Sequence, residues 1–424
     1  MKRLIFIASL AMLAVGCQKT EIQNEVLTPI GFSTEVGKQT RAIVQDDTYN
    51  SEQPFAVYAY GHQENVVTKV MDNVEISFTE GTTSTSDKWA ASVDNNVTTK
   101  YYWPNDPTTT LNFYAYSPAH NTSVSKANKN HQKLNGTVSH SEEGGLTVTN
   151  YTHTNMYVDF MVATPVLEAT FKDQDGSNGS ASGLKSVPLT FGHKMTQVNF
   201  KVQLAENEDY SNIDFKINSI VLNNIVNNGT YSYSYTAPAD QAPASVTESW
   251  SDATTPQKSS YNIYPTTTAS GAPELENVNE PGEGETAATT EETVILRTDY
   301  NSRVVNGNTL AVSAENPGTS FSTTPVTMIP QTLTNTDKTT SDDIISNGGQ
   351  SFTISYTISG TGVATETVTK SFEFADAMTN APVWGINKKI TYTLTISLNE
   401  ITFAPSVATW STDDAEGSYG DPED

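Results

Sequence analysis

Short runs of alternating apolar and polar residues recur along the chain and predict its elements. The clearest are residues 352–358 and 390–398, in which every second residue is Phe, Ile, Tyr or Leu. A period of two places successive side chains on opposite faces, so each run predicts a half-buried β-strand. Residues 54–60 and 111–118 share an aromatic and Ala-rich pattern, and we expect them to be core strands of one sheet system.

A strand of the same kind is predicted near the N-terminus. Ile30, Phe32, Thr34 and Val36 occupy alternate positions and therefore share one face. The segment that follows is rich in Gly, Gln and Thr and contains Arg41, so we expect it to be accessible to solvent.

Helices are nearly absent from the predicted pattern. The one candidate for a helical turn is residues 374–378. Many short strands separated by Gly, Pro and Asn turns are typical of β-sandwiches, and 424 residues suit two such domains. The longest patterned strand region is residues 187–203, with His193 between its two halves, and the acidic patch at residues 205–209 is the best candidate for a domain boundary.

Charge narrows the choice of partners. The chain has 23 Lys plus Arg against 48 Asp plus Glu, which gives a formal net charge of −25. A surface of this sign repels phosphate, so nucleic acid is excluded as a partner, and a polybasic contact with a membrane surface is excluded as well.

The first residues predict export. Lys2 and Arg3 precede an apolar run at residues 4–15, and Gly16 stands directly before Cys17. A basic start, a short apolar core and small residues before the cleavage site are typical of a signal peptide. This apolar core is too short to span a bilayer. The end of the segment resembles the lipobox of a bacterial lipoprotein, in which Cys17 would be acylated. An ordinary signal peptide with an incidental cysteine is the alternative.

Catalytic, metal and cofactor sites are not indicated. Cys17 is the only cysteine, so the mature domains contain no disulfide and no thiolate ligand. The segment from Asp173 begins like a calcium loop, but Leu184 stands where a bidentate acid is needed. No histidine pair has the spacing of a zinc helix, and no nucleophile elbow occurs, so we expect no enzyme. We expect exposed loop positions for His120, His131, His140 and His153, and a packed or turn position for His193.

The aromatic residues admit two interpretations. They are core and cross-strand packing, which we prefer, or some of them form an exposed platform on which sugars stack. The residues concerned are Tyr101, Tyr102, Trp103, Tyr231, Tyr233, Tyr235 and Trp250.

Several short motifs, in order, resemble the fimbrillin-like family, the type V pilins of Gram-negative surface fimbriae. They begin with the lipoprotein signal ending at Cys17, the first strand Ile30-Gly31-Phe32-Ser33-Thr34 and a Thr40-Arg41-Ala42 site. The others are Phe55-Ala56-Val57-Tyr58-Ala59-Tyr60, Tyr102-Trp103-Pro104, residues 111–118, Phe191-Gly192-His193-Lys194-Met195, residues 198–202 and Val407-Ala408-Thr409-Trp410. Each motif is short, and the resemblance rests on their shared order over nearly the whole chain.

The resemblance implies an all-β fold of two tandem transthyretin-like β-sandwich domains. It divides the chain into a lipoprotein signal peptide at 1–16, a tether with a cleavable first strand at 17–41, and domains at 42–205 and 206–424. It also implies lipid anchoring in the outer membrane through Cys17, cleavage between Arg41 and Ala42 by an Arg-specific protease, and loss of the strand that carries Ile30, Phe32, Thr34 and Val36.

A strand from another subunit would then fill the empty groove, and the family implies that this donor comes from the C-terminal region. The candidate residues in this chain are Ile401, Phe403, Val407 and Trp410. The expected partners are other fimbrial subunits, either copies of this chain or sibling pilins, and a host or glycan ligand. The alternative is an anchored outer-membrane lipoprotein that binds a surface glycan or host protein and never polymerises.

Overall fold

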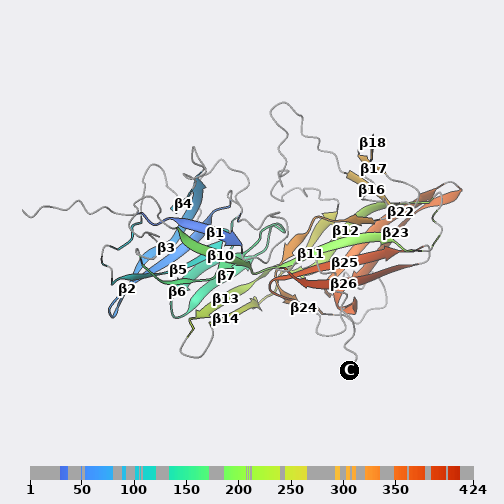
Figure 1. Ribbon diagram of the computed structural model, residues 1–424. Coiled ribbons are helices and arrows are strands. Elements are labelled where there is room, and N and C mark those ends of the chain that lie inside the picture. The colour runs from blue at the N-terminus through green and yellow to red at the C-terminus, as the bar shows by residue number, and fades with distance from the viewer. Residues whose placement is uncertain are drawn as a thin grey trace, which may run out of the picture.

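The structure is a computed structural model of the 424-residue chain. It describes residues 29–36, 49, 53–79, 88–91, 101–104, 106, 108–120, 133–170, 186–206, 208, 210, 213–238, 244–264, 292–296, 302–305, 308–311, 320–334, 348–360, 362–377, 383–397 and 400–410. This part of the chain is all-β, as predicted. The strands gather into two groups, which we call the first lobe and the second lobe (Figure 1).

The first lobe contains a sheet whose strands, with one exception, form a closed ring. Neighbouring strands pair in the order β2 (Phe55–Gln63), β3 (Val66–Thr79), β4 (Lys88–Ala91), β1 (Phe32–Val36), β10 (Val187–His193), β8 (Met161–Ala163), β5 (Thr110–Ser117) and β9 (Val166–Ala169). Strand β2 also pairs with β5, so all of these strands except β9 form a closed ring.

Both faces of this sheet are buried where β2 and β5 lie. Phe55 and Val57 point into a cluster inside the ring, whereas Tyr58 and Tyr60 pack in a second cluster on the other face. A four-stranded sheet covers that second face; its order is β14 (Ser245–Asp252), β13 (Asn228–Thr236), β7 (Gly145–Thr152) and β6 (Thr137–Ser141). The pairing of β2 with β5 confirms that residues 54–60 and 111–118 belong to one sheet system.

The second lobe is built from two larger sheets around one core cluster. The first contains β19 (Ser320–Ser322), β11 (Thr196–Leu204), β25 (Lys388–Ile396) and β26 (Ile401–Thr409), with β20 (Val326–Met328) also on β11. The second contains β18 (Asn308–Ala311), β17 (Ser302–Val305), β16 (Glu292–Leu296), β12 (Ile213–Val226), β22 (Ser351–Gly360) and β23 (Val363–Glu373), with β15 (Lys258–Tyr264) on β12. A two-stranded sheet joins β21 (Gln331–Thr332) and β24 (Val383–Trp384).

The two runs with the strictest alternation are strands of this second core. Residues 352–358 lie in β22 and residues 390–398 overlap β25, and both bury alternate side chains as predicted. Phe352 of β22 and Tyr392 of β25 belong to the same buried cluster. The predicted helical turn is also confirmed, as a 3-10 helix at Phe374–Ala377.

On each side of residue 205, where the sequence suggested a boundary, strands belong to the opposite lobe. The patterned region 187–203 separates into β10 in the first lobe and β11, which pairs with β25 in the second. Beyond residue 205, β13 and β14 return to the first lobe, where β13 pairs with β7. The sheets therefore do not divide at residue 205, because backbone pairing links strands that are far apart in sequence.

The expectation of exposed loop positions is wrong for His140 and His153. Residues 137–152 form the β6–β7 hairpin of the four-stranded sheet. His140 and His153 are 8% and 2% exposed. The segment is polar in composition, but Val138, Leu146 and Val148 supply an apolar face that packs on the tyrosines of β2 and β5. His120 is half-buried and contacts the carbonyl of Leu134.

Candidate functional site

The N-terminal strand β1 closes the ring of the first lobe. It pairs in parallel with β10, from Phe32 opposite Val187 to Val36 opposite Phe191. On its other side it makes a single pairing with β4, between Phe32 and Trp89. The half-buried strand predicted from the alternation is therefore confirmed, and it is held mainly by one neighbour.

The inward face of β1 lies deep in the first core. Ile30, Phe32 and Val36 are 5%, 2% and 6% exposed, and Thr34 is half-buried. The Phe32 ring meets Phe55 and Phe113 edge-on, with ring centroids 6.1 and 5.9 Å apart. Burial of side chains of this size contributes about 1.5–3 kcal/mol each, so this face anchors the strand firmly.

The residues expected to carry lipid and to be cleaved are not described by the structure. Cys17, Arg41 and Ala42 lie outside the described residues, as do His131 and the loop that begins at Asp173. Arg41 follows the end of β1 at Val36 in the sequence. Lipidation and cleavage thus remain predictions.

The candidate donor strand is β26, which lies at the edge of its sheet. It pairs along its whole length with β25, from Ile396 opposite Ile401 to Lys388 opposite Thr409. Ile401, Phe403 and Val407 are only partly buried against the second core. The Phe403 ring lies 5.3 Å from that of Phe352 and 5.1 Å from that of Phe372 between ring centroids.

Trp410 differs from the other candidate donor residues. It follows β26 directly, is 1% exposed, and packs in the cluster of the first lobe rather than that of the second. Its ring stacks on His193, with centroids 4.1 Å apart and an interplanar angle of 3°. His193 Nδ1 donates to Asp159 Oδ2 over 2.8 Å. The prediction that His193 is a packed residue is confirmed.

A relation between the two strands was missed by reading each strand alone. Ile30, Phe32 and Val36 have the spacing Ile-x-Phe-x-x-x-Val, and Ile401, Phe403 and Val407 have the same residues at the same spacing. A direct comparison of the two termini of the sequence would have found it. The structure adds that the first set is buried and the second set lies on an edge strand.

The aromatic residues of the first lobe mostly pack. Trp103, Tyr231 and Tyr233 are buried, which confirms the packing interpretation for them, whereas Tyr101, Tyr102, Tyr235 and Trp250 are half-buried. Trp250 also packs against the cluster that contains Tyr231. Trp103, Tyr231 and Tyr233 therefore take no part in an exposed platform.

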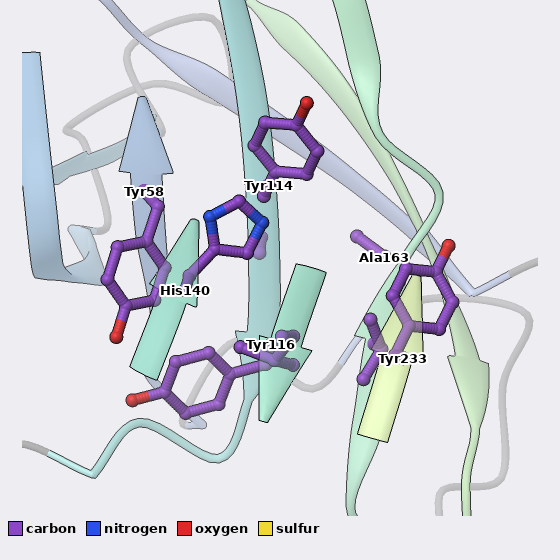
Figure 2. Close-up of a pocket in the computed structure, with 9 residues that line it drawn as sticks. Tyr58, Tyr114, Tyr116, His140, Ala163 and Tyr233 are labelled. Carbon is purple, nitrogen blue, oxygen red and sulfur yellow. The ribbon is translucent and has the colours of Figure 1, made fainter. Parts of the chain in front are cut away.

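A small pocket lies among these aromatic side chains. Figure 2 shows Tyr58, Tyr114 and Tyr116 on two strands of the first sheet, with His140 and Tyr233 beside them. His140 lies 4.2 Å from Tyr114 between ring centroids, and burial lowers its pKa to about 4. The free space is little more than that of one water molecule, which is too small for a sugar ring.

Other chemistry finds little support in the described residues. Among them, no group of three or more His, Cys, Asp or Glu side chains could hold a metal ion. Within the same residues, no helix has the length and apolar character needed to cross a bilayer. The feature with the clearest structural definition is thus the pair of strands β1 and β26.

Comparisons with known proteins support a single family. A search of curated protein sequences found no significant match. Among solved structures, a fimbrial protein from Bacteroides vulgatus aligns with 90% of this chain and 99% of its own, at 16% identity and a TM-score of 0.47. The tip fimbrial protein Mfa3 from Porphyromonas gingivalis aligns with 90% of this chain and 100% of its own, at 11% identity and a TM-score of 0.27.

These similarities are too distant to carry the classification, which rests on the sequence profile. The model of the fimbrillin-like family matches residues 40–410, a range that runs from just before Arg41 to Trp410 and so includes almost every strand of both lobes. The chain therefore belongs to the fimbrillin-like family.

Proposed function

We propose that this protein is a structural or adhesive subunit of cell-surface fimbriae that assembles by strand exchange. It is exported as a lipoprotein acylated at Cys17, held at the outer membrane, and cut between Arg41 and Ala42. The loss of β1 opens the ring, and β26 of another copy fills the groove. The observation that carries this proposal is the shared Ile-x-Phe-x-x-x-Val spacing of β1 and β26.

The groove left by β1 has the properties of a strand-binding site. Along β10 it exposes backbone groups that had been paired with β1. It also opens an apolar pocket beside Phe55 and Phe113, whose rings contact that of Phe32. A strand added to such an edge gains backbone hydrogen bonds from the ladder, and the pockets for its alternate side chains provide specificity.

The shared spacing defines one register for the incoming strand. When β26 runs in the direction of β1, the positions of Ile30, Phe32 and Val36 in the groove are occupied by Ile401, Phe403 and Val407. Pro405 then stands at the position of Thr34.

Proline at that position is compatible with the ladder. Val187 N–H donates to Gly31 O over 2.9 Å, and in a parallel pair the residues that bond one neighbour alternate along the strand. The N–H groups directed at β10 are therefore those of Ser33 and Glu35, not that of Thr34. Pro405 lacks an N–H where none is needed, while Ala404 and Ser406 can donate in place of Ser33 and Glu35.

The first test is the N-terminus of the surface-exposed protein, measured by intact mass and N-terminal sequencing. We expect a start at Ala42 and SDS-resistant ladders of multimers after treatment with an Arg-specific protease. A chain that stays lipidated at Cys17 and remains monomeric would sink the proposal and favour an anchored lipoprotein that binds glycan or host protein, which a glycan array would then test.

The register is tested by disulfide trapping. A chain that starts at Ala42 contains no cysteine, so introduced pairs have no background. Ser33 lies opposite Pro188, and Ala404 takes the position of Ser33 in the proposed register. Pro188→Cys combined with Ala404→Cys should therefore give cross-linked multimers under mild oxidation. The matched control, Pro188→Cys with Ser406→Cys, is two residues out of register and should give few.

A further inference from the structure

The end of β26 is fixed in a different lobe from the strand itself. None of the side chains from Ile401 to Thr409 is fully buried, whereas Trp410 is 1% exposed. Trp410 lies in the cluster between the ring and the four-stranded sheet of the first lobe, with Met195 and Tyr231, and its backbone N–H donates to Asn387 O over 2.9 Å. Besides the ladder with β25, the C-terminal strand is therefore held to its own subunit by one fully buried side chain, that of Trp410.

The side chains around Trp410, which we call its seat, pack closely but form few hydrogen bonds with it or with one another. Its indole lies flat on His193, and His193 is held by Asp159. Trp410 Nε1, His193 Nε2 and Asp159 Oδ1 are buried without a hydrogen-bond partner among the described residues.

One strand joins this seat to the groove of β1. Strand β10 pairs with β1 from Val187 to Phe191, and it ends at His193, on which Trp410 stacks. Its other neighbour, β8, pairs with it only from Phe191 to His193. Without β1, the stretch of β10 from Val187 to Leu189 has no strand neighbour among the described residues. The backbone around His193 is then held by the pairing with β8 and by two flanking hydrogen bonds, from Thr164 N–H to Thr190 O and from Lys194 N–H to Phe160 O.

We propose that Trp410 and His193 form a latch that keeps β26 on its own subunit while β1 is in place, and that loss of β1 loosens the latch through β10. A subunit thus becomes able to donate its strand only after its own groove has opened. The proposal rests on the proposed function, because it takes β1 as the strand removed and β26 as the strand donated. It identifies a coupling between the two sites and the residues that carry it.

The latch is tested by hydrogen exchange of two chains, one that starts at Gln18 and one that starts at Ala42. Both are measured as monomers at low concentration, before assembly. We expect the amides of residues 401–409 to exchange at least tenfold faster in the chain that starts at Ala42. The amides of β22, in the other sheet of the second lobe, serve as the internal control and should not change. Equal exchange of residues 401–409 in the two chains would overturn the latch.

Substitutions separate coupling from simple destabilisation. Trp410→Ala should accelerate exchange of residues 401–409 in the Gln18 chain, and removal of β1 should then add little, because the latch is already open. Thr402→Ala, an exposed position on the same strand, is the matched control and should leave the effect of β1 intact. If Trp410→Ala does not fold, Trp410→Phe keeps an aromatic ring at this position and removes the indole N–H, and the effect of β1 should persist in it. Effects of Trp410→Ala and of β1 removal that simply add would contradict the coupling.

The latch and strand exchange can fail separately. If the Ala42 chain gives cross-linked multimers while residues 401–409 of its monomer stay protected, the latch is wrong and strand exchange stands. If residues 401–409 open but the Pro188→Cys and Ala404→Cys pair never links, the latch stands and the proposed exchange is wrong.

Discussion

Strands β1 and β26 carry the same apolar residues at the same spacing, yet they are buried to different degrees. Phe32 is 2% exposed inside a closed ring, whereas Phe403 is only partly buried on a strand with one neighbour. The difference arises from the surroundings, because Phe55 and Phe113 inside the closed ring pack on the face of β1, and no described strand covers the outer edge of β26. The comparison teaches that a side-chain pattern specifies what a groove can accept, while the number of neighbouring strands decides how firmly the strand is held.

The largest expected effect tests this difference directly. Phe32→Ala in the chain that retains β1 should lower the free energy of unfolding of the first lobe by about 3–5 kcal/mol, since it leaves a cavity between Phe55 and Phe113. Phe403→Ala should cost the second lobe about half as much or less, because the ring is already partly solvated. Urea unfolding of the two variants measures both values, and equal losses would contradict the comparison.

A second prediction concerns the contact between the lobes and depends on pH. His153 is buried in the first lobe, its Nε2 donates to Thr327 O of the second lobe over 2.6 Å, and burial lowers its pKa to about 4. In the unfolded chain histidine titrates near 6.5, so the unfolded state binds more protons between these values. Stability should therefore be full above pH 6.5 and fall by roughly 2–4 kcal/mol as the pH drops toward 4.

His153→Gln separates this contribution from that of other groups. The glutamine amide can still donate to Thr327 O but cannot gain a proton. The free energy of unfolding should therefore depend less steeply on pH, by the amount that His153 contributes. His140, whose pKa is also lowered to about 4 by burial, should leave a residual slope of the same sign. An unchanged slope in the variant would show that His153 does not titrate across unfolding.

The smallest expected effect tests whether β1 can be made to resemble β26. Thr34→Pro copies Pro405 into β1 and should change the free energy of unfolding by less than about 1 kcal/mol, because the N–H of Thr34 does not face β10. Ser33→Pro removes an N–H that does face β10 and should cost about 1–3 kcal/mol. Thermal unfolding of the two variants checks the order, and a larger cost for Thr34→Pro would exclude the proposed register.

The sequence determined the local features of this protein. Alternation alone identified β22 and β25, and the pattern at residues 30–36 identified β1 with its buried face. The helical turn at residues 374–377 was likewise predictable. These features depend on neighbours in the sequence and on a period of two, which a linear reading can detect.

Only the tertiary structure decided which strands share a sheet. Residues 187–203 form one patterned region in the sequence, yet β10 and β11 belong to different lobes, and β13 returns to the first lobe to pair with β7. His140 and His153 stand in a polar segment typical of a loop, yet they are buried because aromatic side chains from distant strands cover them. The placement of Trp410 on His193 is of the same kind. Pairing and burial between residues far apart depend on the whole chain closing on itself, and no local pattern specifies them.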